Sequence, residues 1–270
     1  MHPILIKIGP ITIYTYGFFF ALGILSGLML SLKLAKKENL DRRKISDLIF
    51  YTILIALIGA KISLFFHEIK YYLKYPSEIK YLLTSGGTFY GGLIFGLIFA
   101  FWYIKKHKLN YKVILDIGGP SIALGHFFGR LGCFSAGCCF GRPAGDSIIG
   151  VVFKNPFAGS HTGVPLNTPI YPTQLMEAIL NLLNFIILFF AFKKKKFEGQ
   201  IFVMYIFNYS IIRFFVEYFR GHLTRGYIFG GVSHAFTSLS VPQFISIIGI
   251  IASFILYFKF KKKSDKKYNN

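Results

Sequence analysis

The chain has 270 residues, of which 54% are hydrophobic and 19% aromatic, with 31 Lys and Arg against 11 Asp and Glu. Its mean hydropathy of +0.53 is well above that of a soluble domain with one core, so the composition excludes an ordinary soluble protein and indicates an integral membrane protein. A net charge of +20 would suit nucleic acid, but no basic run is interleaved with an aromatic platform, which argues against a nucleic-acid partner.

Seven stretches are long and apolar enough to cross, or nearly cross, about 30 Å of hydrocarbon as helices. In chain order they are Ile11–Leu32, Ile45–Phe66, Thr88–Ile104, Val113–Arg130, Thr173–Phe192, Gln200–Phe219 and Val241–Phe260. No small-residue cleavage site follows the first stretch, so we expect it to be retained. The expected fold is an all-α integral membrane protein, with residues 1–270 forming a single polytopic membrane domain.

The basic residues are unevenly divided between the two ends of these stretches. The turns after the first, third and fifth stretches, together with the C-terminal tail, carry 20 Lys and Arg, whereas the N-terminus and the other three loops carry 9. By the positive-inside rule, the N-terminus is outside and the C-terminus, with a basic tail at 259–270, is cytoplasmic. Residues 131–172 then form a head region on the outer face.

With this topology, the polar groups of the seven stretches fall in their outer halves. A charged side chain at mid-depth costs roughly 2.5–3.5 kcal/mol on insertion scales, so such residues usually have a function. Their shared depth predicts a polar cavity that opens towards the outer leaflet. Asp47 and Asp116 lie near inner ends, and we interpret them as partners of cytoplasmic basic residues or as helix caps. The outer groups include Tyr16, Lys61, Tyr90, Arg130, Gln174, Glu177, Arg213, Glu217 and Gln243.

The sixth stretch carries the clearest candidate site. Arg213, Glu217 and Arg220 are spaced four and three residues apart, so they line one face of a helix. Because a guanidinium fork suits phosphate and needs a second group to orient it, we interpret Arg213 as an anion clamp oriented by Glu217. The alternative is an intrahelical ion pair that snorkels outward. Arg220 suits either snorkelling or contact with a lipid head group.

A second candidate segment for anion binding begins at Arg130. Gly132 and Gly141 follow it and indicate non-helical backbone at the membrane surface, where free N–H groups can bind an anion. Tyr90, near the outer mouth of the third stretch, suits either catalysis or an interfacial aromatic belt. Gly92 and Gly96, after Tyr90, are explained by close helix packing.

Cys133, Cys138 and Cys139 are the only cysteines. Their C-x4-C-C spacing lacks a second pair, and no His lies at a usual ligand interval, so the spacing gives no reason to expect zinc or another metal. The sequence leaves open whether two of these cysteines form a disulfide on the outer face. We interpret the three as small residues that line the pocket, and expect their replacement to lower activity by less than about tenfold.

Five motifs in order resemble the bacterial prolipoprotein diacylglyceryl transferases, over nearly the whole chain. They are Tyr16-Gly17, the Gly-Gly-x-Phe-Tyr-Gly-Gly-Leu-Ile run around Tyr90, Gly129-Arg130-x-Gly132 with its downstream glycines, Tyr171-Pro172-Thr173-Gln174-Leu175-Met176-Glu177, and Arg213-x-x-x-Glu217-x-x-Arg220. The resemblance implies transfer of the diacylglyceryl group of phosphatidylglycerol to the lipobox cysteine of a prolipoprotein signal peptide. This first step of lipoprotein maturation forms a thioether and releases glycerol 1-phosphate.

The resemblance also implies a location and roles for residues. The enzyme would be a multi-pass protein of the bacterial inner membrane, among membrane lipids, with no cofactor. The implied catalytic residues are Arg130, Arg213, Tyr90 and Glu217. The implied substrate-binding residues are Tyr16, Arg130, Gly132, Cys133, Gly141, Gln174, Glu177, Arg220 and Gln243.

Two departures from the family pattern bear on the mechanism. Tyr90 stands where a histidine is common, and because a tyrosine hydroxyl is a poor base at neutral pH, the base is open and Tyr90 is expected to donate a hydrogen bond to the phosphate. Cys133 and Cys138 stand where asparagine and an acidic residue are common. A lipid-binding or transport protein, or a related transferase with another acceptor, therefore stays an alternative.

Overall fold

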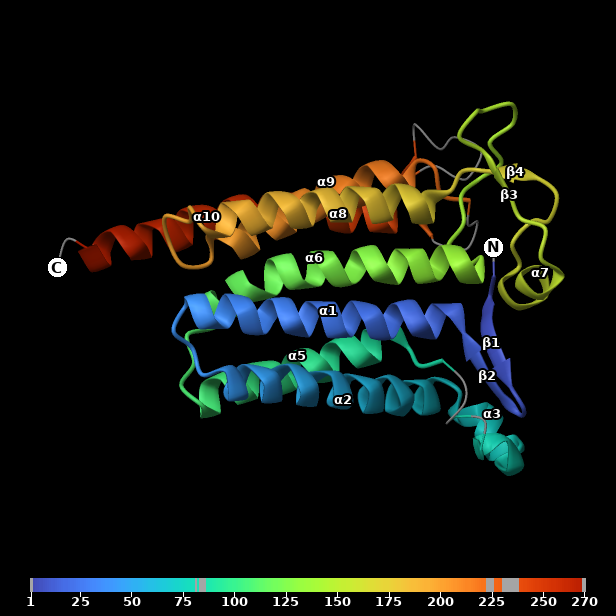
Figure 1. Ribbon diagram of the computed structural model, residues 1–270, viewed down its shortest axis with the longest axis horizontal. Coiled ribbons are helices and arrows are strands. Elements are labelled where there is room, and N and C mark those ends of the chain that lie inside the picture. Colours follow the sequence, from blue (N-terminus) through green and yellow to red (C-terminus); the bar gives the residue numbers. More distant parts are fainter. Residues whose placement is uncertain (1, 81, 83–85, 222–225, 230–237, 269–270) are drawn as a thin grey trace. The chain divides into compact units, whose positions relative to one another are not determined.

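The computed structural model describes residues 2–80, 82, 86–221, 226–229 and 238–268 (Figure 1). The chain divides into two compact units, one of Met1–Leu30 with Leu115–Asn270 and one of Ser31–Ile114. Helices dominate both units, and three short two-stranded antiparallel sheets accompany them in the described residues.

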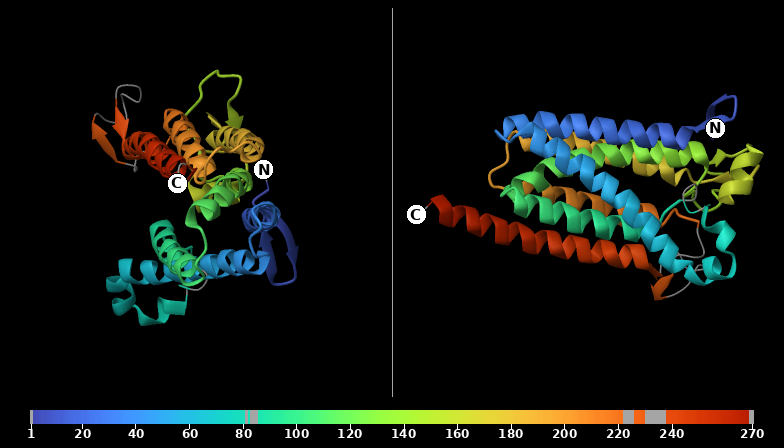
Figure 2. Two further views of the ribbon diagram at one scale, coloured as in Figure 1. Left: turned by 90° about the vertical axis from the view of Figure 1, so that its left-hand side faces the viewer. Right: turned by 90° about the horizontal axis from the view of Figure 1, so that it is seen from below.

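The larger unit contains most of α1 (Thr15–Lys37) and α6 (Tyr111–Ala136), followed by α8 (Thr173–Phe192), α9 (Gln200–Glu217) and α10 (Val241–Tyr268). Helix α9 packs against both α8 and α10, and the three lie side by side in Figure 2. Helices α1 and α6 are antiparallel neighbours, because Gly23 of α1 lies against Phe128 whereas Tyr16, the second residue of α1, lies against Gly132.

Short elements connect and cap these helices. Strands β1 (Ile4–Ile8) and β2 (Ile11–Tyr14) form a hairpin before α1. Strand β3 (Val151–Val152) pairs with β4 (Pro169–Ile170), and α7 (Pro156–Thr162) lies between them. Strand β5 (Tyr227–Phe229) pairs with β6 (Leu239–Ser240) ahead of α10. Phe140, Phe153, Ala158, Val164 and Ile170 form the small apolar core of the segment between α6 and α8.

The smaller unit is built on two long antiparallel helices, α2 (Arg42–His67) and α5 (Phe89–Lys106), with α3 (Ile69–Lys74) and the 3₁₀ helix η1 (Pro76–Lys80) between them. Asp41 caps α2 by accepting a hydrogen bond from Arg43 N at 2.9 Å. Gly92 and Gly96 both face Ala56 of α2, which confirms that they serve close helix packing.

The seven apolar stretches all form helices, and all but one have changed ends. Helix α8 has the predicted bounds, Thr173–Phe192. Residues 11–14, expected to begin the first helix, form strand β2 instead, because their backbone groups pair with β1. Helix α6 continues to Ala136, six residues into the segment expected as a head region. Helix α10 continues to Tyr268, through most of the expected tail.

Five helices among the described residues are long and apolar enough to cross a membrane: α1, α2, α5, α8 and the Val241–Ser264 part of α10. Helices α6 and α9 are not among them, because polar side chains such as Asp116, Arg130 and Arg213 lower their hydropathy. Only 11% of the most apolar window of α2 is buried. Apolar surface of this extent suits contact with lipid, so the chain is a mostly helical, multi-pass membrane protein.

The interpretation of Asp116 as a helix cap is confirmed: it caps the start of α9. This buried residue of α6 accepts hydrogen bonds from the backbone N–H groups of Gly199, Ile201 and Phe202 at 2.9, 2.9 and 3.2 Å. Lys195 lies 3.2 Å from the same carboxylate. A carboxylate of α6 therefore satisfies the first free N–H groups of α9 and complements the positive end of that helix.

We expect Asp116→Ala to destabilise the protein by about 3–5 kcal/mol, because it leaves buried donors and the Lys195 ammonium without their acceptor. Asp116→Asn should cost less, since one carbonyl oxygen remains. Thermal unfolding of the purified protein in detergent would measure the loss, with Asp146→Ala, an exposed loop acid, as the matched control. Equal melting temperatures for Asp116→Ala and the control would contradict this role.

Candidate active site

The candidate site is built by three helices of the larger unit. Arg130 lies on the last turns of α6, Glu177 lies one turn into α8, and Arg213 and Glu217 lie on the last turns of α9. Arg220 lies three residues beyond the end of α9. We call these five residues the arginine–glutamate cluster.

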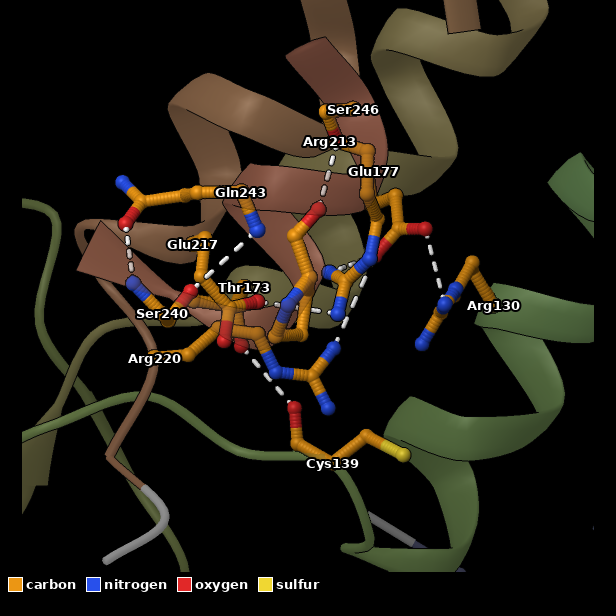
Figure 3. A network of polar contacts seen from close by, with 11 residues as sticks. Arg130, Cys139, Thr173, Glu177, Arg213, Glu217, Arg220, Ser240, Gln243 and Ser246 are labelled. Atoms are coloured by element: carbon orange, nitrogen blue, oxygen red, sulfur yellow. Dashed lines mark hydrogen bonds and ion pairs between the residues drawn. The ribbon is translucent and has the colours of Figure 1, made fainter. Parts of the chain in front are cut away.

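Glu177 is the centre of this cluster (Figure 3). Its Oε1 lies 2.7 Å from Arg130 Nη2, and its Oε2 lies 3.7 Å from Nη1 of both Arg213 and Arg220. A single carboxylate, with its side chain only 1% exposed, therefore pairs with three guanidinium groups from two helices and the segment after α9.

Glu217 makes the second carboxylate contact. Its Oε2 lies 2.9 Å from Arg213 Nη2, one helical turn away. This confirms the expected pairing of Arg213 with Glu217, and the structure adds that Arg213 also contacts Glu177. Two carboxylates hold the Arg213 guanidinium from different helices, which restricts its orientation.

The cluster carries a net positive charge, because three arginines face two glutamates. The side chains of Arg130 and Arg213 are 20% and 16% exposed, whereas that of Arg220 is 2% exposed. Arg213 Nη1 is buried and has no hydrogen-bond partner among the described residues. Arg130 and Arg213 thus combine positive charge, partial access and donor capacity, which are the properties that bind a phosphate.

Arg220 is held in place by a close crossing of three backbone segments. Gly141 N donates to Tyr171 O at 3.0 Å, and Gly141 also forms a bridge with Arg220. A side chain at Gly141 would collide with the carbonyl oxygens of Tyr171 and Phe219. Glycine is therefore required here for close approach of backbones, and this approach sets the position of Arg220.

The loop after α6 is tied to the start of α8. Gln174 Nε2 donates to Cys138 O at 2.8 Å, and Thr173 Oγ1 donates to Cys139 O at 2.9 Å. Both side chains are fully buried, so the two hydrogen bonds fix the loop beside Glu177. Gln174 thus acts on the loop backbone in the described structure.

The same loop gathers the three cysteines, which we call the cysteine triad. Their Sγ atoms all lie within 4.8 Å of one another, and all three residues are partly exposed. Hydrogen bonds within the triad act in opposite directions: those from Cys133 and Cys138 lower the pKa of the Cys139 thiol, and those with Cys133 and Cys139 raise the pKa of the Cys138 thiol. The spacing argument considered neighbours in sequence only, whereas the fold brings all three sulfurs together.

Two further predicted residues have clear local roles. Gly132 packs against Tyr16, since a Cβ at Gly132 would lie 3.2 Å from the Tyr16 ring. Gln243 forms a capping box with Ser240 at the start of α10: Gln243 Oε1 accepts from Ser240 N at 3.0 Å, and Ser240 Oγ accepts from Gln243 N at 3.3 Å. This mutual capping explains why Gln243 is buried.

Tyr90 belongs to the smaller unit, whereas every other predicted site residue belongs to the larger one. It lies on the first turn of α5, is 68% exposed and stacks edge-on against Phe89 at 5.6 Å. Its role in catalysis stays a prediction.

The sequence reasoning named Gln174 and Glu177 but missed that both belong to a buried polar stripe along α8. The members of this stripe recur at helical spacing, which was the signal that could have revealed them. Asn181 Nδ2 donates to Glu177 O at 2.8 Å, and Asn208 of α9 donates to Asn184 Oδ1 at 2.9 Å. The stripe comprises Thr173, Gln174, Glu177, Asn181 and Asn184.

Tyr209 was also missed as a neighbour of the cluster. Tyr209 lies near Arg130, and the His126 ring lies 5.0 Å from the Tyr209 ring. Tyr209 lies four residues before Arg213 on α9, so the helical spacing could have placed both on one face.

The chain is similar to one family of known proteins over nearly its whole length. The family model for prolipoprotein diacylglyceryl transferase matches residues 3–259. The phosphatidylglycerol–prolipoprotein diacylglyceryl transferase of Clostridium tetani is 35% identical over 259 residues, which cover 95% of this chain and 97% of the relative. The protein of the same name from Finegoldia magna is 36% identical over 271 residues, covering 99% and 100%.

A third relative gives the same result. The phosphatidylglycerol–prolipoprotein diacylglyceryl transferase 2 of Clostridium perfringens is 33% identical over 267 residues, covering 99% of this chain and 98% of the relative. Both the match of the family model and the relatives extend over nearly the full length, including every helix that contributes to the arginine–glutamate cluster. The chain belongs to the prolipoprotein diacylglyceryl transferase family.

Proposed function

We propose that this protein transfers the diacylglyceryl group of phosphatidylglycerol to the thiol of the lipobox cysteine of a prolipoprotein. The acceptor sulfur attacks the glycerol carbon that bears the phosphate, a carbon–sulfur bond forms, and the carbon–oxygen bond breaks. Glycerol 1-phosphate leaves with the electron pair of that bond. The product is a thioether, and the reaction is the first step of lipoprotein maturation.

The observation that carries this proposal is the net positive arginine–glutamate cluster. A phosphodiester is a good leaving group only when its growing negative charge is neutralised. In this proposal Arg130 and Arg213 do this; their partial exposure and their contacts with buried carboxylates support the role. Charge donors that are already oriented stabilise a transition state without further reorganisation.

The remaining residues have supporting roles in this proposal. Glu217 and Glu177 orient the arginines, and Arg220 adds positive charge from the buried side of the cluster. Tyr90 donates a hydrogen bond to the phosphate. Tyr16, Gly132, Cys133, Gly141, Gln174 and Gln243 shape the region that binds the lipid and the signal peptide.

The proposal includes a location and an orientation. The enzyme lies in the bacterial inner membrane with seven spans, its N-terminus outside and its C-terminus in the cytoplasm. The 20 against 9 division of Lys and Arg supports this orientation. The segment between α6 and α8 would then meet the signal peptide on the outer face.

Cysteine labelling tests the orientation. In intact cells, a membrane-impermeant maleimide should label a cysteine introduced at Gly159 and leave one introduced at Lys194 unlabelled, in a background with the three native cysteines replaced. After the cells are opened, both positions should react. Equal labelling at both positions before opening would contradict the seven-span, N-out arrangement.

Reconstitution tests the function. The purified protein is incubated with phosphatidylglycerol and a lipobox peptide, and the peptide is analysed by mass spectrometry. We expect the mass of one diacylglyceryl group on the cysteine and release of one glycerol phosphate per transfer. A peptide with serine in place of the cysteine is the matched control. Absence of the thioether product with a folded enzyme would refute the proposal.

A further inference from the structure

The cysteine triad is a concentrated set of soft ligands beside the proposed site. All three cysteines of the chain belong to it, and their Sγ atoms converge within 4.8 Å. Each residue is partly exposed. A set of three thiols that converge on one accessible point suits a thiophilic metal ion.

The backbone is shaped to bring the sulfurs together. Cys133 lies on the last turns of α6, and the chain then reverses at Gly137, with φ of +81°, and at Cys139, with φ of +59°. A left-handed conformation is unfavourable for a cysteine, so the surrounding contacts must hold it there. Gln174 and Thr173 supply such contacts by binding the carbonyl groups of Cys138 and Cys139.

The distances suit zinc. A Zn–S bond is about 2.3 Å long, which separates two sulfurs of a tetrahedral site by about 3.8 Å. Because the three Sγ atoms already lie within 4.8 Å of one another, binding would need sulfur–sulfur distances to shorten by about 1 Å at most. The described residues supply three ligands within this distance, and three protein ligands with one open position are the arrangement of catalytic zinc sites.

The net charges of the zinc–thiolate group and of the arginine–glutamate cluster have opposite signs. Three thiolates and one Zn²⁺ carry a net charge of −1. The adjacent arginine–glutamate cluster carries a net charge of +1 when its three arginines and two glutamates are ionised. Arg130 lies three residues before Cys133 on the same helix, so the two groups are neighbours, and Figure 3 shows Cys139 beside the cluster.

We propose that Cys133, Cys138 and Cys139 bind a zinc ion with one open coordination position, at which the acceptor thiol binds and is deprotonated. This inference rests on the proposed function for the identity of that thiol. In this proposal the zinc ion activates the acceptor thiol. Glu177 and Glu217 are poorly suited to take the proton of that thiol, since both carboxylates are paired with arginines.

The proposed step is balanced. The acceptor thiol forms a sulfur–zinc bond, and its proton passes to water. The sulfur then uses an electron pair to form the carbon–sulfur bond, the sulfur–zinc bond breaks, and the phosphate leaves with the carbon–oxygen pair. The zinc ion returns to its starting state, with no oxidant or reductant consumed. The expectation that the cysteines are dispensable is thereby reversed.

Metal content tests the site directly. The full-length protein, purified without a histidine tag from zinc-supplemented cells, should contain about one zinc ion per chain by plasma mass spectrometry. Cys138→Ser should lose most of it. Ser135→Ala is the matched control, because Ser135 lies between the ligands and donates its hydroxyl to Leu131 O; it should keep both zinc and activity.

Cobalt substitution tests the open position. Co²⁺ bound in place of zinc should show an intense thiolate-to-metal absorption. A lipobox peptide should change this spectrum, whereas the serine version of the peptide should not. No response to the cysteine peptide would overturn the open-position role. A cysteine-free variant should bind no cobalt, and retained cobalt absorption there would overturn the ligand assignment.

The pH profile tests the activation step. A free cysteine with its ordinary pKa is about 3% ionised at pH 7, so loss of the metal should slow transfer by about 30-fold. At pH 9.5 the acceptor thiol ionises without help, and the deficit of the cysteine-free variant relative to wild type should largely disappear. A deficit that is the same at both pH values would instead indicate a purely structural role.

The two proposals fail in different ways. Full transfer activity in a wild-type protein that contains no metal, or a disulfide among the three cysteines of the active protein, would overturn the zinc site and leave the proposed function intact. A folded, zinc-loaded protein that coordinates the cysteine peptide and forms no thioether would overturn the proposed function and leave the metal site intact.

Discussion

Replacement of Arg130 or Arg213 by alanine is expected to lower the rate of diacylglyceryl transfer by about 10²–10³, the effect of losing one preorganised charge donor. The two residues approach the cluster from different helices, and each is paired with a buried carboxylate at 2.7 or 2.9 Å. The rate is measured as release of glycerol phosphate by purified protein in detergent with phosphatidylglycerol and a lipobox peptide.

Lysine at either position should restore activity only in part. A lysine ammonium supplies the charge but lacks the planar fork that can contact a carboxylate and a phosphate at once. Glu217→Gln should cause a milder loss than Arg213→Ala, because Arg213 would keep its contact with Glu177. Lys70→Ala removes an exposed basic residue of the smaller unit and is the control for a general change in charge.

The outcome separates a chemical role from a structural one. Both alanine variants should insert into the membrane and be recovered in folded form. If they do so and still release glycerol phosphate at rates close to that of wild type, the two arginines are not the anion clamp, and the assignment of the site is wrong.

Glu177→Ala is expected to cause the largest combined loss of stability and activity. Its carboxylate contacts Arg130, Arg213 and Arg220, so its removal leaves three arginines with Glu217 as the remaining carboxylate of the cluster. Breaking a buried ion pair by removing one partner costs about 3–5 kcal/mol. The melting temperature in detergent should fall, and transfer should be lost even at temperatures where the variant is folded.

Glu177→Gln separates the charge from the shape of this residue. Glutamine keeps the volume and one oxygen acceptor, so its loss of stability should be smaller than that of alanine. Glu68→Gln, at an exposed glutamate of the smaller unit, is the matched control. A Glu177→Ala protein with unchanged melting temperature and activity would contradict the central position of this carboxylate.

Local patterns predicted much of the helical architecture. Continuous apolar stretches located all seven long helices, and the bounds of α8 were correct at both ends. The pairing of Arg213 with Glu217 followed from their spacing of four residues. These features depend on contacts within one helix, or on transfer of one segment into lipid, so a short window of sequence contains their physical cause.

The ends of several helices depend on contacts with segments that are distant in the sequence. The first predicted helix lost residues 11–14 to a hairpin with β1, and α6 extended to Ala136. The first N–H groups of α9 are capped by Asp116, which lies more than eighty residues earlier in the chain. Hydropathy does not register such pairings, because they depend on which segments become neighbours.

The composition and order of motifs were thus sufficient for the membrane class, the helices and the identity of the candidate arginines. Only the tertiary structure decided that Glu177 joins arginines from two helices and the segment after α9. It alone also decided that Cys133 meets Cys138 and Cys139 across the end of α6. The physical reason is that ion pairs and metal ligands act over a few ångströms, and these distances are set by helix packing and loop conformation rather than by spacing along the chain.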